Sequence, residues 1–129
     1  LNARGLIVWL GSTAGADLRP VLAHGYSEKT LARIPTLTRS ADNAAAAAYR
    51  TGELQVVTAR QSGANGTVVA PLVTSDGCIG AVTAEIREGG EQSDATRALA
   101  TILAAQLAGL LAPAAGAAAT APEAQSAIG

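Results

Sequence analysis

The sequence predicts an α+β domain in which an antiparallel five-stranded sheet carries helices on both faces. Two apolar, β-branched runs flank Asp76-Gly77, and an Asp-Gly between such runs is a strong signal for a β-hairpin. Both runs are apolar almost throughout, which is typical of strands that are covered on both faces. The last helix carries an apolar stripe at helical spacing. The expected order of elements is β-β-α-α-β-β-β-α.

Two strands are predicted at the start of the chain, over residues 5–10 and 18–24. Each is a short apolar run that ends at a glycine, as expected for a buried strand. Pro20 lacks an amide donor, which favours an edge position or a bulge within the second strand. The short connection between the two runs predicts that they form a hairpin.

Two short helices are predicted next. Ser27 is a suitable N-cap for the first one. Five consecutive alanines, 44–48, give the second helix a high helical propensity and little side-chain bulk. Asp42 or Asn43 can cap its start, and Gly52 stands where a left-handed C-cap glycine is expected. We expect the backbone of this alanine helix to approach the sheet, or a ligand, closely.

A third strand is predicted at 54–58, and the final helix begins after a cap at Ser93 or Asp94. From 112 to 129 the chain has too little apolar bulk to offset its ordering entropy, which predicts a disordered tail. We therefore expect one domain, 1–111, followed by that tail. The apolar residues on one face of the final helix are Leu99, Ile102, Leu103, Leu107, Leu110 and Leu111.

Composition and charge disfavour several classes of protein. A chain of 129 residues is long enough for one domain with a core of normal size. A net charge of −1 and 2% aromatic residues disfavour a nucleic-acid-binding protein. No signal peptide or apolar run of membrane-spanning length is recognised, so we expect a cytoplasmic domain without membrane insertion. The chain begins at Leu1, so we expect it to be a piece of a longer protein.

Five short stretches resemble motifs of GAF domains, the ligand-sensing and dimerising modules of bacterial signalling proteins. Residues 4–10 resemble the first strand, 22–27 the second strand with its exit into a helix, and 48–53 the step from helix to third strand. Residues 69–72 and 77–82 resemble the "vPL…dG…iGvl" hairpin of the family. The order and spacing of these stretches make the resemblance specific, and together they span most of the chain.

The resemblance implies a GAF/PAS/profilin-like fold and a sensory or regulatory function in signal transduction. It implies a domain that is not an enzyme, has no cofactor, and binds a small molecule or forms a homodimer through its terminal helices. GAF domains usually open with a helix that packs beside the last one. Here we expect at most its final turn, at Leu1–Ala3. The connection at 59–66 is short for the family, which implies a thin pocket wall.

The predicted ligand-binding residues are Arg39, Asp42, Asn43, Trp9 and Tyr49. The first three precede the alanine helix, on the side of the sheet where GAF domains hold ligands. Amide groups at a helix N-terminus favour an anion, and an arginine can pair with a phosphate or carboxylate. The same Arg-x-x-Asp spelling occurs at the cyclic-di-GMP site of some signalling proteins. The alternatives are that Asp42 or Asn43 caps the helix, that Arg39 is solvated or pairs with Asp42, and that both aromatics fill the core.

Three further residues are interpreted as structural. GAF enzymes that reduce free methionine sulfoxide use several cysteines, and bilin-binding members carry a cysteine near a histidine. Cys78 fits neither pattern and is expected to be a small buried hydrophobe. His24 and Cys78 do not make a zinc site, so no metal is expected, and Glu85 is expected to face outward. A ligand-free protein–protein interaction module is the alternative function, and a redox or haem enzyme is a more distant one.

Overall fold

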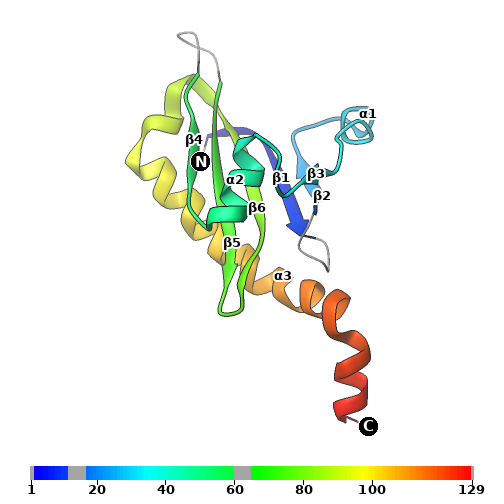
Figure 1. The fold of residues 1–129 in the computed structure, drawn as a ribbon. Helices are drawn as coiled ribbons and strands as arrows, with labels where there is room; N and C mark the ends of the chain where they lie inside the picture. Colours follow the sequence, from blue (N-terminus) through cyan, green and yellow to red (C-terminus); the bar gives the residue numbers. More distant parts are fainter. Residues whose placement is uncertain (1, 12–16, 60–64, 129) are drawn as a thin grey trace.

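The computed structural model describes residues 2–11, 17–59 and 65–128, with side chains described as far as Ala112 except at Leu31. Figure 1 shows a curved sheet with one long helix behind it and a short helix in front. In chain order, the elements are β1 (Ala3–Gly11), β2 (Asp17–His24), α1 (Glu28–Leu31), β3 (Leu37–Thr38), α2 (Ala44–Thr51), β4 (Gln55–Val57), β5 (Gly66–Thr74), β6 (Gly77–Ile86), the 3₁₀ helix η1 (Arg87–Gln92) and α3 (Asp94–Ile128).

The strands form one antiparallel sheet in the order β3-β2-β1-β6-β5-β4. The hairpin predicted around Asp76-Gly77 is confirmed as β5 and β6, which pair along their whole length. The sheet has six strands rather than the five expected. The additional strand, β3, is only two residues long and pairs with Asp17 and Leu18 of β2. The strand β3 follows Pro35. Because a proline disfavours helical backbone at the residue before it, an extended segment at this point agrees with the sequence.

The second strand is irregular near Pro20, as predicted. Val8 of β1 pairs with Leu22, but the next residue, Trp9, pairs with Pro20. Val21 is therefore the extra residue of a β-bulge, a place where a strand tolerates a proline that lacks an amide proton. The bulge leaves Val21 exposed on this strand.

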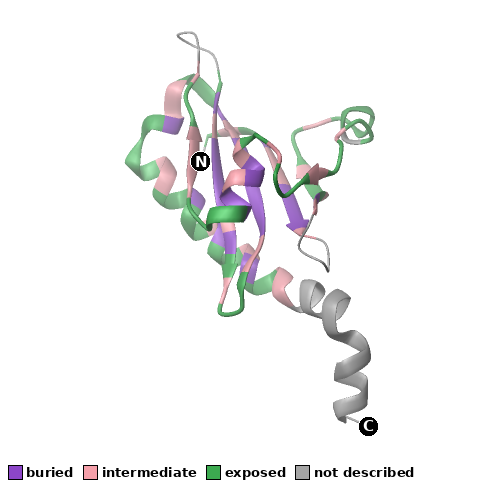
Figure 2. Cartoon of the chain, viewed as in Figure 1, coloured by how far each residue is buried: buried purple, intermediate pink, exposed green. Residues whose placement is uncertain are grey.

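The two faces of the sheet pack against different helices, which confirms the predicted α+β architecture. Alternate strand residues point to opposite faces, so β1 contributes Val8 to one apolar cluster and Trp9 to the other. The cluster behind the sheet includes residues of α3, and the cluster in front includes residues of α2. Figure 2 shows the buried residues concentrated in the central strands between these helices.

Helix α3 rests on the sheet through alanines. Ala100, Ala104 and Ala108 recur every four residues, are buried, and belong to the cluster behind the sheet. Their small side chains let the helix axis approach the strands closely, so the bulkier residues of the predicted stripe lie beside or away from the contact. The predicted tail at 112–129 lies almost wholly where side chains are not described, so its disorder stays a prediction.

Several local predictions can be compared with the backbone directly. Ser27 caps α1 by accepting a hydrogen bond from the amide of Thr30 at 3.1 Å. Gly52 ends α2 with the left-handed backbone expected of a C-cap, at φ 69°. The expected final helical turn at Leu1–Ala3 is wrong for Ala3, which is the first residue of β1. Ala3 instead pairs with Ile86 of β6 as part of the sheet.

Candidate functional site

Trp9 and Tyr49 are both buried in the cluster between α2 and the sheet. The indole Nε1 of Trp9 donates a hydrogen bond to Oγ1 of Thr83 on β6 at 3.0 Å. This bond satisfies the one polar atom of the indole, as a buried tryptophan requires. With Leu18, the two aromatic side chains fill the space in front of the sheet. Both aromatics therefore pack as core residues, which was the alternative to ligand binding. Contact of either residue with a ligand stays a prediction.

Arg39 lies against Tyr49. Its guanidinium carbon is 5.5 Å from the centroid of the Tyr49 ring, within the range of a cation–π contact. Burial raises the pKa of Tyr49, the positive charge of Arg39 partly offsets this rise, and Cys78 adds slightly to it. The structure thus brings Arg39, Trp9 and Tyr49 to one region. In the described residues, Arg39 forms no ion pair with Asp42.

Asn43, rather than Asp42, caps helix α2. Its Oδ1 accepts a hydrogen bond from the amide of Ala46 at 2.9 Å. Asp42 is exposed beside it. The cap uses one of the free amides that would otherwise attract an anion at this helix start. Asn43 therefore has the structural role named above as the alternative to ligand binding, which is to cap the helix.

Arg50 holds the segment that precedes α2, and sequence reasoning did not single it out. Its Nη1 donates to the carbonyl oxygen of Arg39 at 2.6 Å and to that of Ala41 at 2.9 Å. Both bonds are charge-assisted and fix the backbone on which Arg39 stands. A sequence pattern gives no signal for such a contact, because any exposed arginine near a loop can make it.

Glu85 does not simply face outward, as its sequence suggested. It lies on the same face of β6 as Thr83, and its side chain is partly buried. Three donors reach its carboxylate: Arg4 at 3.0 Å, the Tyr26 hydroxyl at 3.3 Å and the Asn65 amide at 3.4 Å. Burial raises the pKa of Tyr26, and the nearby carboxylate adds to the rise. The only sequence signal for this polar cluster was an acid within an apolar strand.

Cys78 and His24 occupy separate places in the fold. The thiol of Cys78 lies 3.2 Å from the carbonyl oxygen of Gly80, and burial is the main reason its pKa is raised. His24 is exposed at the end of β2, on the side of α3. Among the described residues, no group of three or more histidine, cysteine and acidic side chains could hold a metal ion.

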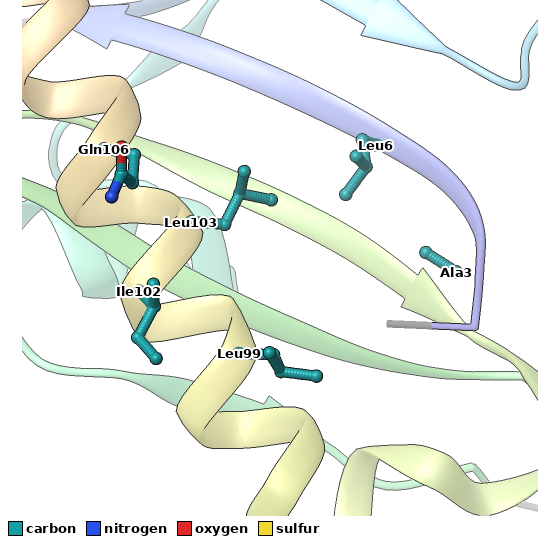
Figure 3. A pocket seen from close by; sticks show the side chains of 6 residues that line it. All are labelled: Ala3, Leu6, Leu99, Ile102, Leu103 and Gln106. Carbon is teal, nitrogen blue, oxygen red and sulfur yellow. The ribbon is translucent and has the colours of Figure 1, made fainter.

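An apolar groove lies between α3 and β1 (Figure 3). Its volume is about 520 Å³, and among the described residues that line it, Gln106 alone is polar. Leu6 of β1 and Leu103 of α3 point toward one another across it. Both residues also line a smaller adjoining cavity of about 140 Å³, which His24 borders. The larger groove is lined by Ala3, Leu6, Leu99, Ile102, Leu103 and Gln106.

Helix α3 exposes large aliphatic side chains, two of which line this groove. Leu99, Ile102 and Leu110 are 49%, 56% and 75% exposed, although large aliphatic side chains are usually buried. Over Asp94–Ala112, α3 is long and apolar enough to cross a membrane by length and composition, with 17% of that window buried. A single helix of this kind is weak evidence, because helices that pack on the core of a water-soluble domain pass the same test.

Solved structures of low sequence identity share this architecture. The GAF domain of an Acinetobacter phosphoenolpyruvate-protein phosphotransferase superposes with a TM-score of 0.70 at 15% identity, covering 87% of this chain and 72% of that one. The GAF-B domain of DevS from Mycobacterium smegmatis gives 0.63 at 20% identity, covering 98% and 87%. A type II free methionine-R-sulfoxide reductase from Thermoplasma acidophilum gives 0.66 at 13% identity, covering 85% and 79%.

The sequence itself matches no family model and no curated protein. The similarity therefore rests on the arrangement of strands and helices. That arrangement agrees with the strand and hairpin motifs that the sequence shares with the GAF pattern. This chain has the fold of a GAF domain.

Proposed function

We propose that this chain is a sensory or regulatory domain of a bacterial signalling protein that works by association through α3. One observation carries the proposal. Leu99 and Ile102 of α3 are exposed and line one wall of an open apolar groove beside the sheet. Contiguous apolar surface of this kind marks an interaction site more often than an ordinary solvent-exposed face.

A second copy of this chain is the partner that fits the surface. Between Ala95 and Ala112, the one charged side chain is Arg97, and its Nε donates to the carbonyl oxygen of Glu91 at 3.0 Å. Two such helices can therefore meet without like-charge repulsion. Leu99 and Ile102 of one copy would enter the groove of the other, which gives a self-complementary, two-fold interface.

Small-molecule binding in front of the sheet is the second candidate function. The partly buried Glu85 cluster and the Arg39–Tyr49 contact favour it, because both place charged groups against the sheet on the side of α2. A ligand that orders the segment 27–50 would shift the equilibrium between arrangements of the domain, as any ligand with unequal affinity for two states does. A thermal-shift screen with nucleotides, cyclic-di-GMP and small metabolites tests it, with Arg39→Ala as the comparison.

The proposed domain is not an enzyme. The Thermoplasma reductase has a similar fold, but this chain has a single cysteine. A cycle that forms and resolves a disulfide within one chain needs at least two. Burial raises the pKa of Cys78, which lowers the fraction of reactive thiolate at neutral pH. We also propose that α3 does not enter a membrane, since insertion would expose the strand residues that its alanines now cover.

The deciding experiment is the concentration dependence of the molecular mass. We expect the chain to form dimers in analytical ultracentrifugation, and the double variant Leu99→Gln/Ile102→Gln to sediment as a monomer. Val73→Gln is the matched control, because Val73 is 51% exposed on β5 but does not belong to α3. A wild-type chain that stays monomeric at high concentration contradicts the proposal, as does a Val73→Gln variant that dissociates equally.

A further inference from the structure

Glu91 is a charged residue type, yet its side chain is fully buried. It has no part in the proposed self-association. It lies in η1, where Glu88 and Gly89 have left-handed backbone at φ 55° and 77°. Such backbone is uncommon outside glycine, so the turn at Glu88 is a specific feature of this connection. The turn returns the chain to the sheet, and η1 contacts both β4 and β5.

The carboxyl group of Glu91 lies between the exit of β4 and the start of β5. Its Oε2 accepts a hydrogen bond from the amide of Ala59 at 2.8 Å. On the other side it packs against Gly66, where an added Cβ would overlap the carboxyl carbon. Gly66 is itself buried. The absence of a side chain at Gly66 therefore creates the space that the carboxyl group occupies.

The same residue is also bound by α3. The backbone carbonyl oxygen of Glu91 accepts a hydrogen bond from Nε of Arg97 at 3.0 Å. Arg97 lies in the first turns of α3, and its amide donates to the carbonyl oxygen of Ser93 at 3.1 Å. One residue thus contacts β4 and β5 with its side chain and the start of α3 with its backbone.

The chemistry of this position argues against simple space-filling. Within residues 2–11, 17–59 and 65–128, Oε1 of Glu91 is buried without a hydrogen-bond partner, and a buried polar atom in that state costs free energy. An aliphatic residue of similar volume would fill the space without that cost, but it could not accept the amide proton of Ala59. The bond to Ala59 is what the carboxyl group adds.

We propose that Glu91 is a positioning residue that couples the strands β4 and β5 to the start of α3. A displacement at Ala59 or Gly66 moves the carboxyl group, and the η1 backbone carries this movement to Arg97. The coupling is a property of the fold and does not depend on self-association. Only an effect of this coupling on self-association through the apolar face of α3 rests on the proposed function.

Amide hydrogen exchange of the whole chain tests the coupling, read at residues 97–101, because Arg97 is the first residue whose amide donates to a carbonyl oxygen of the helix start. We expect Gly66→Ala on β5 to speed exchange there roughly tenfold, because local opening becomes easier when a buried contact is lost. Glu91→Ala should have a similar effect. The double variant Gly66→Ala/Glu91→Ala should exchange no faster than Glu91→Ala, since no carboxyl group remains to be displaced.

Two controls separate coupling from general destabilisation. In Gly80→Ala on β6, the new Cβ would meet the backbone of Trp9 rather than Glu91, so exchange at 97–101 should not change selectively. Glu91→Gln keeps an oxygen for the Ala59 amide and should retain slow exchange. If Gly66→Ala does not fold, the comparison of Glu91→Gln with Glu91→Ala decides the question.

Additive effects of Gly66→Ala and Glu91→Ala at 97–101 would overturn the proposal, as would failure of Glu91→Gln to preserve slow exchange. The exchange pattern should be the same in Leu99→Gln/Ile102→Gln. A chain that does not self-associate would therefore refute the proposed function and leave this readout intact.

Discussion

The guanidinium group of Arg39 lies over the ring of Tyr49, 5.5 Å from its centroid. Arg39 is exposed, whereas Tyr49 is buried among the residues that join α2 to the sheet. Arg50 fixes this arrangement by donating to the backbone oxygen of Arg39. The contact therefore links a surface charge to the core in front of the sheet.

Replacing Arg39 by alanine should lower the free energy of unfolding by about 0.5–1 kcal/mol, the usual size of an exposed cation–π contact. The pKa of Tyr49 should rise further, because the positive charge of Arg39 now lowers it. Urea unfolding measures the first effect and ultraviolet absorbance titration the second. Arg33→Ala, another exposed arginine of the same segment, should change neither. Equal effects in the two variants would contradict the assignment.

Ala104→Leu should destabilise the domain by about 1–3 kcal/mol, because added volume in a closely packed contact forces strain. Ala104 is 1% exposed where α3 meets the sheet. Its neighbour Ala105 is exposed on the same helix, so Ala105→Leu should stay within about 0.5 kcal/mol of the wild type. Thermal and urea unfolding of both variants check this difference. If the two substitutions cost the same, α3 does not rest on the sheet through Ala104.

Stability should fall as the pH rises above about 9. Burial raises the pKa of Cys78 in the folded state above its ordinary value of 9.0. Above that pH the unfolded chain binds fewer protons than the folded chain, so the free energy of unfolding decreases with rising pH. Below it, both states hold the thiol proton and this group gives no pH dependence. The raised pKa values of Tyr26 and Tyr49 extend the decline above pH 10.

Urea unfolding of the wild type and Cys78→Ala, from pH 7 to well above pH 10, measures this decline. The variant should lose the part that begins near pH 9 and keep the part due to the tyrosines. Tyr26→Phe serves as a second comparison, since it should reduce only the later part. Identical pH profiles for Cys78→Ala and the wild type would show that the thiol does not contribute.

Features set by neighbouring residues were predictable from the sequence. The caps at Ser27 and Gly52 depend on side chains and backbone within one turn, and the β5–β6 hairpin depends on a two-residue loop. The bulge at Pro20 follows from one missing amide proton. The short strand β3 was missed because two residues carry no periodic pattern, and their pairing depends on where β2 ends.

The candidate site was less predictable, because its contacts join distant parts of the chain. The sequence singled out Asn43 but left open whether it caps α2, which the bond to Ala46 answers. It could not show that Arg50 binds the backbone of Arg39, nor that donors surround Glu85. Burial of Glu91 was equally hidden, since a charged loop is normally solvated. Ligand binding by the predicted residues remains a prediction.

The position of β1 has a consequence for how the domain is made. This strand is synthesised before the other described strands of the sheet, yet it lies between β2 and β6, and its residue Ala3 pairs with Ile86. During translation, one hydrogen-bonding edge of β1 therefore stays open until nearly the whole domain has left the ribosome. Pairings of this range slow folding and leave an unpaired edge exposed to other chains. We expect nascent chains that end before β6 to need a chaperone, whatever the stability of the finished domain.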